Sequence, residues 1–394
     1  MFRFFIPSMK RINLKLTLFF CTCLILLCGC APVGEYVYEY TGIDWLIDTD
    51  CVITDESEYY PVQGYGYTTL SANEQRLYKD MADAANTYRS FVKVDFGCTV
   101  QRAKQLYYCF TADFPQLFWV DGYSYSSFGD RVTGIYLNYS FDKEESESLW
   151  NEMEQELIAC DQALSLLKSD FDKSVWINDY LCNKVAYTSD HDNRYIAYGA
   201  LIDGKAVCAG YAKAAQLLFY SQDMTCLYVR GFSQNERHGW NIVQLDGDYY
   251  HLDVTWNDAI RKNDGPNTHF YTYQHISDEI IAGDHEIYPD ENCPLPACDS
   301  MEQNYFYQKD LRFTSQKTLP EKVAAEAVTS FRQDDYIVDF MVGEQVDVEA
   351  FIDEGMSRVY RTIRNKMGYV PVSYTYSYSR NEEIGTVRLY FTPK

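Results

Sequence analysis

The apolar positions between residues 71 and 170 recur mainly at helical spacing. Ser71 and Glu74 form a capping-box pattern at the start of one helix. The apolar residues along one side of that helix are Leu77, Met81, Ala84, Tyr88 and Phe91. Two more helices are predicted at residues 100–111 and 143–167, and two strand-like runs at 123–127 and 132–141. Residues 71–170 therefore predict a mostly helical N-terminal domain.

Two helical patterns also stand at the start of residues 171–290. The first covers residues 172–184, and its predicted inward-facing residues are Val175, Trp176, Tyr180 and Leu181. The second begins at Cys208, and its pattern is set by Tyr211, Ala214, Ala215 and Leu218. Because nearly all residues of the second helix are apolar or small, we expect that helix to be buried.

A pair of strands follows the second helix. The runs at residues 242–245 and 248–254 flank the dipeptide Asp246-Gly247. Asp-Gly between two such runs is the strongest short signal for a hairpin with a two-residue turn. Residues 171–290 therefore predict a core in which a helix packs on an antiparallel sheet, and the fold class is α+β.

The C-terminal residues 301–394 predict a separate, small α+β unit. A segment with two prolines and two cysteines, residues 291–300, marks the boundary before it. The predicted elements are a helix at 321–331, a strand at 336–341, a helix at 348–366 and a hairpin formed by 372–378 and 385–391.

The first residues of the chain have the layout of a bacterial export signal. Four basic residues precede an apolar run, Leu16–Leu27, that is short for a membrane span of about 20 residues. The run ends in Leu-Cys-Gly-Cys, which resembles the lipobox of bacterial lipoproteins and implies that Cys30 carries lipid. We expect a signal peptide at 1–29, a tether at 30–70, and an exported protein whose lipid anchor holds it on the membrane, facing the cell exterior or periplasm. A plain transmembrane anchor is the alternative.

Composition and charge narrow the possible partners. The chain has 394 residues, enough for two or three domains, and its hydrophobic share of 47% is that of a globular protein. The formal charge of −23 would repel nucleic acid and anionic lipid, so we expect no nucleic-acid partner.

The cysteines suit an exported chain. With the signal, Cys30 and a free Cys208 set aside, an even number remains, which is compatible with disulfides in an oxidising compartment. Those cysteines are Cys51, Cys98, Cys109, Cys160, Cys182, Cys226, Cys293 and Cys298. No CxxC pair or Cys/His cluster has zinc spacing, so we expect no metal site and no cofactor.

Cys208 is the candidate nucleophile. In the first turn of a helix, free N–H groups and the positive end of the helix dipole favour a thiolate. Two alternatives stay open at this point. Cys208 is either an inert buried cysteine, which is common for free thiols, or one half of a latent disulfide, for instance with Cys226.

The predicted hairpin turn gives Cys208 two partners. If Leu245 faces Asp248, the same register puts Trp240 opposite Asp253, and His238 lies on the face of Asp253. Diagonal neighbours of this kind are about 7–8 Å apart at the backbone, which an imidazole and a carboxylate can bridge. His251 is expected on the opposite face, as a structural or surface histidine, whereas Trp240 either packs inside or walls the cleft.

Two motifs then resemble a known family. "GKAVCAGYAKA" and "HGWNIVQLDGDYYHLDVTWND" are similar to the transglutaminase-like superfamily, a papain-like group that includes peptide N-glycanases and microbial cysteine proteases. The resemblance covers roughly residues 172–258 and implies that Cys208, His238 and Asp253 are a catalytic triad. The chain departs from the family pattern at Gly239, where alanine is usual.

These features predict a surface-anchored thiol enzyme that forms a thioester on Cys208. Its expected partners are protein or cell-wall peptide substrates outside the membrane, and the membrane itself through the lipid anchor. A cysteine protease or amidase is favoured. The alternatives are an acyltransferase that cross-links proteins, and a non-catalytic binding or adhesion module on the same scaffold.

Overall fold

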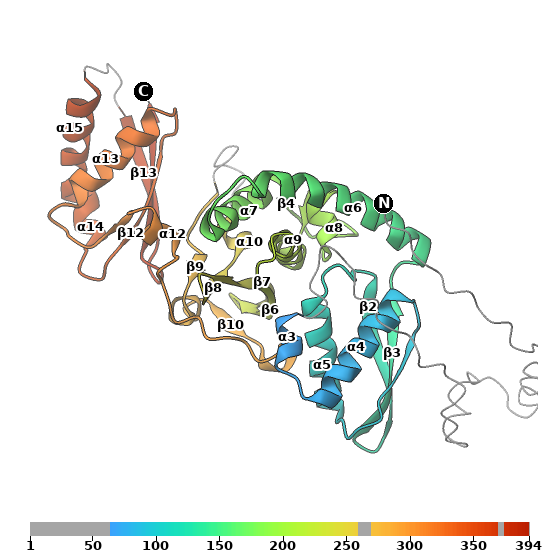
Figure 1. Cartoon of the computed structure of the whole chain (residues 1–394). Helices are drawn as coiled ribbons and strands as arrows, with labels where there is room; N and C mark the ends of the chain where they lie inside the picture. Colours follow the sequence, from blue (N-terminus) through green and yellow to red (C-terminus); the bar gives the residue numbers. More distant parts are fainter. Residues whose placement is uncertain (1–63, 259–268, 369–373, 394) are drawn as a thin grey trace, which may run out of the picture. The chain divides into compact units, whose positions relative to one another are not determined.

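The structure is a computed structural model that describes residues 64–258, 269–368 and 374–393 (Figure 1). The predicted signal peptide, the lipid site at Cys30 and most of the predicted tether lie outside these residues. Within the described ranges, no helix combines the length and the hydropathy needed to cross a membrane.

The first described part holds helices and a small antiparallel sheet. The helices are α3 (Tyr65–Thr68), α4 (Ala72–Asn86) and α5 (Val100–Asp113), and the strands, in the sheet order β1–β3–β2, are β1 (Phe91–Lys93), β3 (Arg131–Tyr139) and β2 (Val120–Phe128). The capping box at Ser71 and Glu74 is present. The helix it starts ends at Asn86, before Tyr88 and Phe91, because Tyr88 has a φ of +56° and Phe91 pairs with Tyr136 in the sheet.

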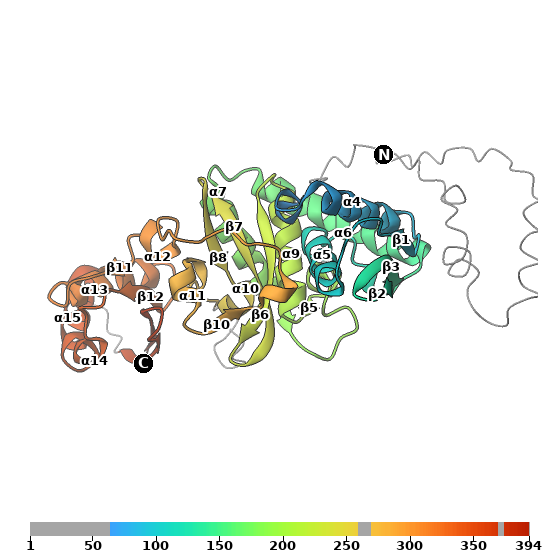
Figure 2. The ribbon, with the colours of Figure 1, turned by 90° about the horizontal axis from the view of Figure 1, so that it is seen from below.

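The core is a five-stranded antiparallel sheet with a helix packed on it. The strand order is β10 (His285–Ile287), β6 (Cys226–Ser233), β7 (Glu236–Leu245), β8 (Asp248–Leu252) and β9 (Gln274–Ile276). Helix α9 (Cys208–Tyr220) packs against β6 and β7, and α6 (Lys143–Leu164) and α7 (Asp170–Lys184) also contact it (Figure 2). This arrangement confirms the predicted α+β fold class.

Helix α9 is buried as its apolar sequence predicted. Its interior residues from Gly210 to Tyr220 are buried except Lys213. The one buried amide on it, Gln216, donates through Nε2 to the carbonyl oxygens of Ala112 at 2.8 Å and Cys226 at 3.1 Å. These bonds tie the helix to the end of α5 and the start of β6. A helix held on several sides fixes the position of Cys208 at its first turn.

The hairpin of β7 and β8 has the predicted register. Leu245 pairs with Asp248, and the last pair of the ladder is Asn241 with Leu252. The two turn residues have φ values of +51° at Asp246 and +96° at Gly247, the left-handed geometry of a type I′ turn. The turn is therefore two residues long, which sets the face on which His238 lies.

Helix α7 buries Leu181 as predicted, but the rest of its buried side differs from the predicted one. Its buried residues are Phe171, Ser174, Ile177, Asn178 and Leu181, whereas Val175, Trp176 and Tyr180 are only half-buried. The two polar residues are accommodated because they are hydrogen-bonded. Asn178 accepts from Asn257 at 2.9 Å, and Ser174 lies 2.6 Å from the imidazole of His275.

The C-terminal part is a four-stranded sheet covered by helices. The strand order is β11 (Arg312–Phe313), β12 (Ile337–Val342), β14 (Thr386–Pro393) and β13 (Tyr374–Asn381), with the helices α13 (Leu319–Phe331), α14 (Val348–Ala350) and α15 (Met356–Met367). The predicted helix at 348–366 is interrupted by a π-helical turn at Phe351–Gly355. The Phe351 ring packs so closely over Gly355 that a Cβ there would lie 2.7 Å from it.

One disulfide links distant parts of the chain. Cys109 in α5 is bonded to Cys293, 184 residues further on. The other described cysteines, which include both Cys208 and Cys226, are free thiols. The alternative of a latent Cys208–Cys226 disulfide is therefore wrong for this structure, and Cys226 is instead buried at the start of β6.

Candidate active site

Cys208 is the first residue of α9, with Val207 as the N-cap. The residue is half-buried and its thiol is free. Gly210 allows the backbone at Arg194 to approach the start of the helix, because a Cβ at this position would lie 2.6 Å from the carbonyl oxygen of Arg194. The N–H of Gly210 donates to the carbonyl oxygen of Val207 at 2.9 Å, so the N–H groups of Cys208 and Ala209 are the ones that the helix leaves available to a ligand.

His238 and Asp253 meet as the hairpin register predicted. Nε2 of His238, on β7, lies 2.6 Å from Oδ2 of Asp253. Asp253 directly follows β8 and caps the short helix α10 (Val254–Asn257), where its Oδ1 accepts from the N–H of Trp256 at 3.0 Å. The side chain of His238 is 9% exposed and that of Asp253 is 1% exposed. A charge on Asp253 thus has almost no water to stabilise it.

The electrostatics of the pair favour a protonated imidazole. Burial disfavours the charged ring, but the charge of Asp253 and the hydrogen bonds to Asp253 and Cys208 outweigh it and raise the pKa of His238 to about 10. Burial would also raise the pKa of Asp253, yet His238 and His285 hold that pKa below its usual range. The structure therefore brings Cys208, His238 and Asp253 together in one hydrogen-bonded chain.

Trp240 packs behind the imidazole of His238. The two rings are stacked, with centroids 5.9 Å apart and planes at 19°, and Trp240 is only 1% exposed. Its Nε1 donates to Nδ1 of His251 at 3.0 Å, and Nε2 of His251 lies 2.7 Å from Asp278. His251 is therefore held between Trp240 and Asp278. The expectation that it lies on the face opposite Asp253 is wrong, because it is two residues from Asp253 and bonds to Trp240, which stacks on His238. Of the two alternatives for Trp240, it packs inside the domain, because it is too deeply buried to form a wall of the cleft.

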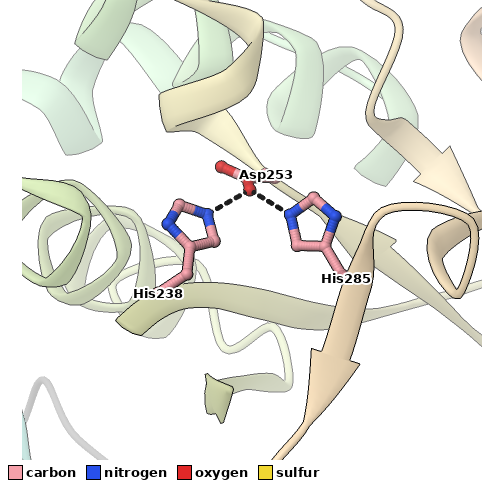
Figure 3. Close-up of side chains that lie close together, drawn as sticks. All are labelled: His238, Asp253 and His285. Carbon is pink, nitrogen blue, oxygen red and sulfur yellow. Dashed lines mark hydrogen bonds and ion pairs between the residues drawn. The ribbon is translucent and has the colours of Figure 1, made fainter. Parts of the chain in front are cut away.

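His285 is a neighbour that the sequence pattern did not indicate. Its Nε2 lies 3.0 Å from Oδ2 of Asp253, the oxygen that also contacts His238 (Figure 3). Its strand, β10, has three residues and pairs with β6 at the edge of the sheet. A three-residue strand has too little periodicity to be recognised, so no signal in the sequence places His285 beside Asp253.

Two groups of described residues bring potential metal ligands within 4.8 Å of one another. They are His238 with Asp253 and His285, and His251 with Asp278 and Cys298. In the first group both Nε2 atoms already contact Asp253, and in the second both nitrogens of His251 are engaged. The hydrogen bonds account for both clusters, and we assign neither as a metal site.

Gly239, which stands where alanine is usual in the family pattern, lies against a tyrosine side chain. A Cβ at Gly239 would lie 2.5 Å from the hydroxyl oxygen of Tyr228 on the neighbouring strand β6. Arg230 covers the Tyr228 ring, with its guanidinium carbon 4.8 Å from the centroid. The phenol therefore occupies the space that an alanine side chain would need, next to the catalytic candidate His238.

Comparison with known proteins supports the family resemblance. The family model of the transglutaminase-like superfamily matches residues 160–254. No curated protein matches the chain significantly.

Several solved structures match weakly. A TGase is 15% identical, with a TM-score of 0.27, over 37% of this chain and 46% of its own. A protein named as a putative cysteine protease from Cytophaga hutchinsonii is 12% identical, with a TM-score of 0.25, over 34% and 62%. Menin, with its binding site for the Mixed Lineage Leukemia protein, is 15% identical, with a TM-score of 0.24, over 57% and 54%. The chain thus spans about half to three fifths of these proteins, and scores this low carry no argument about function.

The matched residues contain Cys208, His238 and Asp253, and they cover α9 and the hairpin that the two motifs predicted. Residues 160–254 of this chain therefore form a domain of the transglutaminase-like superfamily.

Proposed function

We propose that this protein is a thiol enzyme in which Cys208 attacks the carbonyl carbon of amide or peptide groups. The observation that carries this proposal is the contact chain from Asp253 through His238 to Cys208. Asp253 holds His238 in one orientation and stabilises its positive charge, and His238 in turn stabilises a thiolate. The transglutaminase-like family match supports the same roles for the three residues.

In the proposed reaction, the Cys208 thiolate attacks the carbonyl carbon and the carbonyl π electrons move onto oxygen. The N–H of Cys208, at the open start of α9, donates to that oxygen. The His238 imidazolium gives its proton to the leaving nitrogen as the C–N bond breaks, so an amine departs and a thioester remains. Water or a second amine then attacks the thioester, gives a proton to His238 and releases Cys208.

The surface beside Cys208 suits a peptide substrate. Tyr187 lies in β4 (Ala186–Tyr187), which pairs with β5 (Lys205–Ala206) just before Cys208. Burial and the charge of Cys208 raise the pKa of Tyr187, as expected for a phenol close to the nucleophile. Tyr187 is 44% exposed and Tyr195 is 54% exposed. We propose that these two rings contact side chains of the substrate next to the attacked bond.

We further propose that the reaction takes place outside the cell membrane, on proteins or cell-wall peptides, with the chain anchored through lipid on Cys30.

Hydrolysis, as in a protease or amidase, is favoured over transfer to an amine by the resemblance to bacterial members of the family. Trapping decides between them. The full-length chain is incubated with cell-envelope peptides with and without a primary amine, and the products and the acyl group on Cys208 are identified by mass spectrometry. Free acids support hydrolysis, whereas new amides support cross-linking.

Labelling of Cys208 separates an enzyme from a non-catalytic binding module. Iodoacetamide modification is followed by peptide mapping from pH 5 to 9, with Cys182 as an internal control, because burial raises the pKa of Cys182 well above its usual value. The enzyme proposal expects Cys208 to react far below the ordinary thiol pKa of about 8.5, and this advantage to disappear in His238→Ala. A Cys208 that reacts only near that pKa, equally in both proteins, would contradict the proposal.

A further inference from the structure

His285 stands between two carboxylates. Its Nε2 lies 3.0 Å from Oδ2 of Asp253, and its Nδ1 lies 2.5 Å from Oδ1 of the preceding residue, Asp284. The side chain of His285 is completely buried, and those of Asp253 and Asp284 are 1% and 16% exposed. Each nitrogen of this buried ring therefore contacts a carboxylate, one on Asp253 and the other on Asp284.

The hydrogen bonds require His285 to be an imidazolium. Ionised carboxylates only accept hydrogen bonds, so a ring that bonds to one at each nitrogen must donate from both. Asp284 also accepts a hydrogen bond from the hydroxyl of Tyr273, which keeps Asp284 an acceptor. Burial disfavours the charge, but the hydrogen bonds to Asp253 and Asp284 raise the pKa of His285 above its usual value. The hydrogen-bond geometry and the raised pKa both favour the protonated ring.

The other groups around His285 hold the ring in place. Its centroid lies 5.1 Å from Trp240, 5.5 Å from Tyr273 and 6.0 Å from Trp256. The titratable groups that face it are Asp253, Asp284, Tyr273, His238 and His251. His238 is the important one, since the two rings are 5.3 Å apart and share a single carboxylate oxygen.

Without His285, Asp253 would have no partner on that side. Its Oδ1 is held by the N–H of Trp256, and its Oδ2 is held from two directions by the two imidazoles. Removing one of them leaves a buried carboxylate oxygen short of a donor and free to rotate away from His238.

We propose that His285, anchored by Asp284, is a positioning residue that fixes Asp253 in the orientation from which it orients His238. This inference rests on the proposed function. The ring touches neither Cys208 nor substrate and acts through Asp253 alone. The positive charge of His285 disfavours a proton on His238, so this charge does not help to keep His238 protonated. The role of His285 is therefore chiefly geometric, and a neutral side chain that keeps the hydrogen bond to Asp253 should substitute for it.

The test compares three variants of the full-length chain: His285→Leu, His285→Gln and His285→Asn. The measurement is the rate of iodoacetamide reaction of Cys208 between pH 6 and 7, where only an ion pair with His238 gives a thiolate. His285→Leu should react about tenfold more slowly, the effect of losing one hydrogen bond to a charged group. Glutamine, whose amide reaches Asp253, should restore most of the rate, whereas the shorter asparagine reaches only Asp284 and should not.

His275→Gln is the matched control for loss of a buried histidine. His275 is also completely buried, but it bonds to Ser174 and the carbonyl oxygen of Gln303, away from Asp253. It should lower stability and leave the Cys208 rate unchanged. Equal rates in His285→Gln and His285→Asn, or a wild-type rate in His285→Leu, would overturn the positioning role. A wild-type protein without rapid reaction at pH 6–7 would instead overturn the proposed function itself.

Discussion

Two buried histidines, His238 and His251, lie beside Trp240 and each contacts an aspartate, yet their pKa values are shifted in opposite directions. The pKa of His238 is raised to about 10 against the opposing effect of burial, by Asp253 and by the hydrogen bond to Cys208. Burial lowers the pKa of His251, although Asp278 lies 2.7 Å from it. A neighbouring carboxylate alone therefore does not make a histidine cationic.

The difference comes from the second ring nitrogen and from exposure of the carboxylate. Trp240 donates to Nδ1 of His251, so this nitrogen must accept and the ring is neutral. Asp278 is also 46% exposed, and water screens its charge. Asp253 is 1% exposed, so only its hydrogen-bond donors balance its charge. His238 is suitable for thiolate chemistry because its carboxylate partner is buried and because, unlike His251, its ring does not accept a hydrogen bond from Trp240.

The largest effect is expected from Asp253→Asn, compared with Asp278→Asn. The first variant removes the charge that holds His238 protonated, and the rate of thioester formation on Cys208 should fall by about 10³–10⁴-fold, as for the equivalent change in Ser-His-Asp enzymes. The second should lower the rate only slightly, because His251 is already neutral. Rates are measured by quenched-flow mass spectrometry of acylated Cys208. Equal losses in the two variants would contradict the distinction between the pairs.

The contact between His238 and Asp253 could be predicted from the hairpin turn, whereas the contact of His285 with Asp253 could not. Asp246 and Gly247 are adjacent in sequence and determine the register locally, and the register puts His238 on the face of Asp253. His285 joins the site through a three-residue edge strand that begins more than 30 residues after Asp253. No local pattern carries such a contact, because it depends on how the whole sheet assembles.

Buried polar residues were missed for a related reason. The pattern of apolar residues predicted that Val175, Trp176 and Tyr180 face inward, and it gave no sign that the polar Ser174 and Asn178 are buried, because polar side chains usually face water. In the structure they are buried, because Asn257 and His275 supply their hydrogen-bond partners. Pattern-based prediction places polar residues correctly only when their partners are local.

A smaller effect is expected from Trp240→Phe. Phenylalanine keeps an aromatic ring against His238 but loses the N–H that bonds to His251, which leaves a buried acceptor without its donor. The free energy of unfolding should fall by about 1–3 kcal/mol. Urea denaturation measures this loss, and iodoacetamide labelling of Cys208 should hardly change. A large loss of Cys208 reactivity at unchanged stability would show that Trp240 acts in the site and not only behind it.

His238 and His275 should also give opposite pH trends in stability. The pKa of His238 is raised to about 10, so its contribution is complete below the unfolded pKa of about 6.5 and is lost as pH rises through 10. Burial lowers the pKa of His275 to about 4, so its contribution is complete above about 6.5 and is lost as pH falls to 4. Urea midpoints across this range should lose the alkaline slope in His238→Gln and the acid slope in His275→Gln. Variants with unchanged slopes would contradict these assignments.

The most direct test of the proposed ion pair between His238 and Cys208 is the protonation state of the imidazole rings. Nitrogen-15 NMR of the histidine rings, assigned with His238→Gln and His251→Gln, reports whether each nitrogen carries a proton across pH 5–10. We expect His238 to stay an imidazolium at pH 7 and to titrate only near 10, and His251 to be neutral at pH 7 with its proton on Nε2. A neutral His238 at pH 7 would contradict the ion pair with Cys208 and, with it, the proposed chemistry.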